Sequence, residues 1–92
     1  MTERETSATV LATSGNYAVI QLNDRRYPAL SIQGDSLKIL QETIEELAED
    51  LRMKDLAGAD LSLREVRSVV SDMLSSYESA AADKGFELPY TR

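Results

Sequence analysis

The chain of 92 residues contains no cysteine and no histidine. Without cysteine there are no disulfides and no thiolate chemistry, which agrees with a reducing compartment, so we expect a cytoplasmic protein. Without histidine the chain lacks the usual general base near neutral pH, the common zinc ligand and the partner of Ser-His or Cys-His nucleophiles. The sequence also has no glycine-rich phosphate-binding loop. We therefore expect no enzyme activity, no cofactor and no metal site.

Long apolar runs are missing too, since none approaches the roughly 20 residues of a membrane span. The first nine residues are polar in character, so we expect neither a signal peptide nor a membrane partner. We expect residues 1–92 to form a single domain, with residues 1–5 as a loose lead-in. A domain this small has modest stability, and burying more of its surface in a dimer or complex would stabilise it further.

The formal net charge of −6 is concentrated in the middle of the chain. Residues 35–85 contain twelve acidic and six basic residues, whereas the segments before and after are balanced. A field of this sign repels nucleic acid and anionic lipid and attracts basic proteins. The charge therefore favours another protein, of basic character, as the partner. The alternative is an acidic surface that only keeps the protein soluble.

Three period-two segments predict strands over residues 7–13, 17–22 and 27–33, with short turns at 14–16 and 23–24. A helix is predicted over residues 37–57, ended by Gly58, and a second from a capping box at 62–65 to Gly85. The apolar stripe of the first helix contains Leu37, Leu40, Ile44, Leu47 and Leu51. That of the second contains Leu63, Val66, Val70, Met73, Tyr77 and Ala80.

Residues 86–90 alternate apolar and polar side chains, and we expect them to pair at an edge of the sheet. The element order is then β-β-β-α-α-β. Because each helix must bury its stripe and each strand has one apolar side, the economical arrangement has two layers. The sequence predicts an α+β fold, with an antiparallel three- to four-stranded sheet and two helices on one face.

Acidic residues gather on the side of the first predicted helix that lies opposite its apolar stripe. They are Glu42, Glu45, Glu46, Glu49 and Asp50. This side is either a solvated outer face or a docking surface for a basic partner. A metal site is disfavoured, because like-charged carboxylates on an exposed helix face have no matching ligands to close a cage.

The sheet side turned away from the helices is a second candidate. If Val10 and Ile20 face the helices, the opposite side presents Leu11, Tyr17, Val19 and Tyr27. An apolar patch of this kind marks a partner surface, unless the terminal segment or a second copy covers it.

Arg25 and Arg26 lie beside Tyr27 and could stack on a nucleic-acid base. Because the protein as a whole is acidic, we expect the two arginines instead to lie at the rim of a protein interface or to pair with acidic side chains on neighbouring strands.

Residues 25–37 read R-R-Y-P-A-L-S-I-Q-G-D-S-L. The string resembles the signature R-[RK]-[FY]-P-x-[LV]-x-[IV]-Q-G-D-[ST]-L of a family of short, uncharacterised bacterial proteins, which also carry N-Y-A-V (residues 16–19 here) and L-P-Y (residues 88–90 here). The resemblance implies a shared fold and no activity. A weaker likeness is to HicB-type antitoxin domains, which also place a Q-G-D-[ST]-L break before an amphipathic helix. That likeness favours a toxin-neutralising role and transfers no residue roles.

The sequence therefore predicts a non-catalytic protein-interaction domain, specifically an immunity- or antitoxin-like inhibitor of a basic partner. One alternative is a self-assembling structural module that forms a homodimer or other homo-oligomer without another partner. A second alternative is a carboxylate-based enzyme or metal binder, because an Asp/Glu pair can perform acid-base chemistry or hold magnesium.

Overall fold

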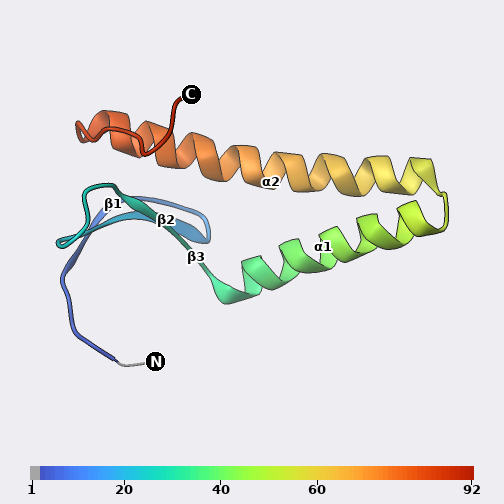
Figure 1. Ribbon diagram of the computed structural model, residues 1–92, viewed down its shortest axis with the longest axis horizontal. Helices are drawn as coiled ribbons and strands as arrows, with labels where there is room; N and C mark the ends of the chain where they lie inside the picture. Colours follow the sequence, from blue (N-terminus) through green and yellow to red (C-terminus); the bar gives the residue numbers. More distant parts are fainter. Residues whose placement is uncertain (1–2) are drawn as a thin grey trace. The chain divides into compact units, whose positions relative to one another are not determined.

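The computed structural model of the protein describes residues 3–92. Figure 1 labels its elements in chain order: β1 (Ala8–Ser14), β2 (Tyr17–Leu22), β3 (Ala29–Ile32), α1 (Gly34–Arg52) and α2 (Leu56–Asp83). The predicted α+β class and the order β-β-β-α-α are confirmed. The chain divides into two compact units, one holding the strands together with residues 74–92, the other holding residues 33–73. The long helix α2 contributes to both.

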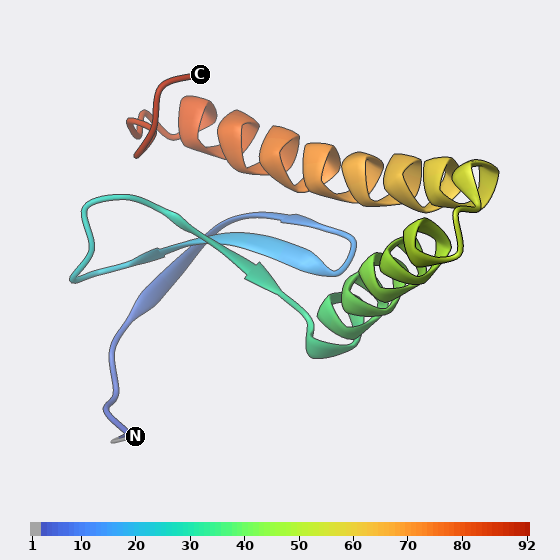
Figure 2. The same ribbon diagram turned by 45° about the vertical axis from the view of Figure 1, so that its right-hand side comes forward.

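The sheet of the first unit is an antiparallel meander in the order β1-β2-β3 (Figure 2). Ser14 pairs with Tyr17, which leaves Gly15 and Asn16 as a two-residue turn. Gly15 has a φ of +59°, as the first central residue of a type II′ hairpin turn requires. The turn predicted at these residues is therefore confirmed.

A β-bulge in β1 decides which side chains share a face of the sheet. Val10 pairs with Ile20, whereas Ala12 pairs with Val19, so Leu11 is the extra residue between them. Strict alternation predicted Val10 and Ala12 on the same face. The extra residue places them on opposite faces instead, because a bulge shifts the register by one position.

The core of the first unit lies between the sheet and the last turns of α2. Val19 is only 2% exposed, and Tyr77 and Ala80 of α2 are buried beside it. The hydroxyl group of Tyr77 donates a buried hydrogen bond of 2.7 Å to the carbonyl oxygen of Pro28. Burial raises the pKa of the Tyr77 hydroxyl above its ordinary value. Tyr77 and Ala80 belong to the apolar stripe predicted for the second helix, and both are buried.

The chain after α2 turns back along that helix instead of joining the sheet. Gly85 ends the helix with a φ of +76°, as predicted. Beyond it, the Tyr90 hydroxyl donates to Glu78 Oε2 at 2.9 Å, and the Tyr90 ring stacks on Tyr77 with centroids 6.4 Å apart. The fourth strand predicted over residues 86–90 is wrong, because residues 84–92 form no strand. Within that segment Pro89 has no N–H to donate to a ladder.

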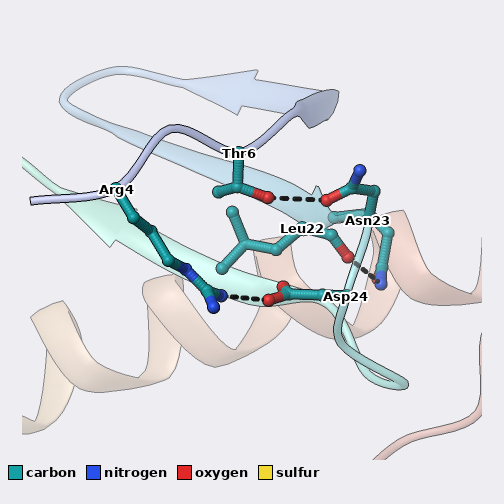
Figure 3. A network of polar contacts seen from close by, with 6 residues as sticks. Arg4, Thr6, Leu22, Asn23 and Asp24 are labelled. Carbon is teal, nitrogen blue, oxygen red and sulfur yellow. Dashed lines mark hydrogen bonds and ion pairs between the residues drawn. The ribbon is translucent and has the colours of Figure 1, made fainter.

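Side chains before β1 contact the turn between β2 and β3 (Figure 3). Arg4 forms an ion pair with Asp24, and the Thr6 hydroxyl donates to Asn23 Oδ1 at 2.7 Å. The backbone N–H of Asn23 also donates to the carbonyl oxygen of Ser7 at 3.1 Å. Of the predicted loose lead-in, residues 3–5 are exposed, with Arg4 anchored in this way, and residues 1–2 lie outside the described residues.

Candidate protein-interaction surface

The second unit is a helical hairpin, formed by α1, the turn at residues 53–55 and the first part of α2 up to residue 73 (Figure 1). The turn is a Schellman motif, in which Lys54 N–H donates to the Leu51 carbonyl oxygen and Asp55 N–H to the Asp50 carbonyl oxygen. Lys54 takes the left-handed position with a φ of +58°. Asp55 then caps α2, since its Oδ1 accepts a hydrogen bond of 3.0 Å from Gly58 N–H.

The predicted helix boundaries in this region are wrong. Gly58 does not end the first helix but lies in the first turn of α2, and Ser62 is buried within α2 instead of capping it. A Cβ atom at Gly58 would lie 2.6 Å from Asp55 Oδ2 and 2.9 Å from Asp50 Oδ2. The glycine therefore lets the two helices approach closely beside the turn.

Each helix of the hairpin buries one stripe of side chains spaced three and four residues apart. On α1 the buried and half-buried residues of the stripe are Ser36, Leu40, Thr43, Leu47 and Asp50. On α2 they are Ala59, Ser62, Val66, Val69 and Met73. The close approach of Asp50 to Gly58 indicates that these stripes face each other.

Two further rows of large apolar side chains remain exposed to water, by 39% to 73%. They repeat every seven residues and consist of Leu37, Ile44 and Leu51 on α1, and Leu56, Leu63 and Val70 on α2. At 100° per residue, each row lies about 80° to the same rotational side of its helix's buried stripe. Because α2 runs back relative to α1 (Figure 1), equal rotations place both rows on one side of the hairpin. We call these six residues the apolar face.

Acidic side chains occupy the opposite side of the hairpin. They are Glu42, Glu46 and Glu49 on α1, and Glu65 and Asp72 on α2, and all are exposed. The same rotation places them about 80–140° to the other side of the buried stripes. We call these five residues the acidic face. Among them, within residues 3–92, only Glu49 forms an ion pair, with Arg52 at 2.6 Å.

The predicted acidic cluster is thus divided by the structure. Glu42, Glu46 and Glu49 belong to the acidic face, and Glu45 is exposed next to it on the outer side of α1. Asp50 is half-buried and lies against Gly58 at the helix contact, so its carboxylate is not part of the exposed surface. Glu65 and Asp72 were not predicted as part of this cluster, because only the packing of the two helices places them on the same side as the acidic residues of α1.

The predicted apolar patch on the uncovered side of the sheet is wrong for three of its members. Val19 lies in the core, and Leu11 packs against that core. Tyr17 is two residues from Val19 in β2 and therefore shares its face of the sheet. The bulge at Leu11 and the packing of α2 on the Val19 side account for the difference.

The basic pair Arg25 and Arg26 lies with Tyr27 in the segment between β2 and β3, and the three line an open hollow there. The Arg26 guanidinium is 5.1 Å from the centroid of the Tyr27 ring and pairs with Glu87 at 3.3 Å. Arg26 is therefore held by contacts within the chain, and its acidic partner comes from the tail and not from a strand. Both arginines are exposed, and Tyr27 is half-buried.

Within residues 3–92, no group of three acidic side chains is placed to hold a metal ion. Over the same residues, neither helix combines the length and the apolar character needed to cross a membrane. The hairpin presents two contrasting surfaces, the apolar face and the acidic face.

Comparison with known proteins assigns the chain to a family. No curated protein and no solved structure matches the chain. A family model described as a family of unknown function, DUF6959, matches residues 3–90. Because this match spans nearly the whole chain, the protein belongs to the DUF6959 family.

Proposed function

We propose that this protein is a non-catalytic protein-interaction domain that binds a basic partner through the acidic face and the adjoining Glu45. The observation that carries the proposal is the convergence of exposed acids from two helices on one side of the hairpin. Opposite charges accelerate the encounter of two proteins, and apolar contacts lengthen the lifetime of the complex. The acidic face supplies the first of these effects.

The finer form of the proposal is an immunity- or antitoxin-like inhibitor. A toxin that acts on nucleic acid needs a basic surface, and an acidic protein neutralises it by covering that surface. The likeness of residues 33–37, Q-G-D-S-L, to the break before the helix in HicB-type antitoxin domains supports this form.

The test compares two triple variants of equal charge. The partner is captured from native lysate at low salt, and its association rate with the pure protein is measured at rising salt. Glu45→Lys, Glu46→Lys and Glu49→Lys together should slow association at least about tenfold at low salt, and the effect should shrink as salt screens it.

The matched control carries Glu3→Lys, Glu5→Lys and Asp83→Lys, which change the net charge equally at exposed sites away from the hairpin faces. It should slow association much less. Equal rates for the wild type and the first triple variant would remove the acidic face from the proposal.

A further inference from the structure

We propose that the apolar face binds a second copy of this chain, so that two hairpins form a two-fold symmetric dimer with four packed helices. This inference uses the side of the hairpin opposite the acidic face and does not depend on the function proposed above. Six large side chains with heptad spacing remain exposed there, and heptad spacing is the pattern by which helices pack along one another.

The area of the apolar face is sufficient for a stable dimer. Each row spans fifteen residues, 37–51 and 56–70, or about 21 Å of helix at 1.5 Å per residue. A helix about 10–12 Å across that buries a third to a half of its circumference over this length contributes roughly 240–360 Å². Four such helices bury roughly 1,000–1,450 Å² in total, which reaches the range of specific interfaces.

The arrangement of the rows suits a copy of itself. The rows on α1 and α2 have equal length and spacing, and Ile44 and Leu63 lie at about the same distance from the turn at Lys54. A two-fold axis parallel to the helices therefore brings each row onto the other row of the second copy. An interface of this kind is self-complementary, as two-fold symmetry demands.

Charge selects between the two ways in which the faces can meet. Residues 34–52 of α1 carry six acidic residues against two basic ones, so α1 packed on α1 would bring like charges together. Along the outer edge of the apolar face, α2 instead presents Arg67 and Arg64, of which Arg64 also pairs with Asp60 of its own helix at 2.9 Å. On α1 the outer edge presents Glu45, which lies between the apolar face and the acidic face. Packing α1 on α2 of the second copy places these opposite charges side by side. Both acidic faces then remain in water.

The test measures molar mass in solution for the full chain, by light scattering or sedimentation, across about three decades of concentration around the micromolar range. We expect a mass twice the chain's 10.2 kDa at the upper end. Ile44→Glu with Leu63→Glu should raise the dissociation constant at least about 100-fold, since two unpaired charges per chain would enter the interface. Leu56→Glu, at a side chain 73% exposed in the single chain, should raise it as well.

The matched control is Ile39→Glu with Leu61→Glu. These side chains are of the same types, on the same helices, and 60% and 69% exposed, but they lie off the apolar face. The control should dimerise like the wild type. A wild type that stays monomeric throughout, or two double variants with equal effects, would overturn the proposal. Because the contacts of the dimer are mainly apolar, the dimer should persist at high salt, whereas the complex with a basic partner should weaken. Salt dependence therefore distinguishes failure of this proposal from failure of the function proposed above.

Discussion

The hydroxyl group of Tyr77 makes the contact in the first unit whose removal has the most clearly defined effect. It joins α2 to the carbonyl oxygen of Pro28 at 2.7 Å, across 49 positions of sequence, and both residues are buried. Tyr77→Phe keeps the ring that packs on Val19 and Ala80 and removes only the donor. The carbonyl oxygen of Pro28 then remains buried without this partner.

The expected cost follows from the burial. A typical hydrogen bond contributes about 0.5–1.5 kcal/mol net, and a buried acceptor left without its donor costs about 1–3 kcal/mol. We expect Tyr77→Phe to lower the free energy of unfolding by about 1.5 kcal/mol. For a domain of this size, that loss corresponds to a fall in Tm of about 6–12 °C.

The assay is urea denaturation at fixed protein concentration, followed by far-ultraviolet circular dichroism. Tyr90→Phe is the matched control, because it removes the same atom from an exposed ring whose hydroxyl group donates to the carboxylate of the half-buried Glu78. The control should change the free energy of unfolding by no more than about 0.5 kcal/mol. Equal losses in the two variants, or a loss below about 0.5 kcal/mol for Tyr77→Phe, would refute the reasoning.

Three other predictions concern the turn and the tyrosines. Lys54→Gly should raise the free energy of unfolding, measured by urea denaturation, by about 0.5 kcal/mol. The change relieves the strain of the left-handed backbone at Lys54, and the greater entropy of glycine in the unfolded chain offsets part of that gain. A lower free energy of unfolding would contradict this prediction. Asp55→Ala should lower the free energy of unfolding by about 1 kcal/mol, because it removes the side chain that caps α2. Asp55→Asn keeps a capping oxygen and should change it by no more than a few tenths of a kcal/mol. Equal losses in the two variants would show that the cap contributes nothing. The raised pKa values of Tyr77, by burial, and of Tyr90, by burial and Glu78, mean that the folded state holds these protons more tightly than the unfolded state. The contribution of these two hydroxyl groups to the free energy of unfolding should therefore be complete below about pH 10 and should be lost as the pH rises beyond it. Tyr77→Phe should make this loss smaller. A free energy of unfolding that does not change with pH in this range would contradict the pKa directions.

Local signals in the sequence were sufficient to predict much of the secondary structure. The bounds of β2, the turn at Gly15 and the end of α2 at Gly85 were predicted correctly, because alternation and glycine conformations act over a few residues. The start of α2 was missed because Lys54 adopts a conformation that usually favours glycine, while the candidate stop at Gly58 lies four residues later. Local propensity did not distinguish between these two positions.

The errors in the sheet have a non-local origin. Nothing in the sequence around Leu11 marks a bulge, since the register of β1 depends on its pairing with β2. That shift moved Ala12 to the face of Val19. The packing of α2 on the same face then buried most of the predicted apolar patch. Likewise, the predicted stripe of the first helix is buried only in part, because Leu40 and Leu47 are half-buried whereas Leu37, Ile44 and Leu51 are exposed. Tertiary packing decides this division, and the pattern of the helix alone does not show it.

Cross-linking tests the apolar face as an interface most directly, because the chain has no cysteine of its own. Ile44→Cys and Leu63→Cys chains, one carrying a tag that separates them by mass, are mixed and oxidised mildly. A disulfide needs Cβ atoms about 3.5–4.5 Å apart, and the dimer with α1 on α2 brings these two positions together. We predict that the mixed disulfide exceeds either same-site product, and that Ile39→Cys with Leu61→Cys gives little. No disulfide between chains, or equal yields from both pairs, would contradict the interface.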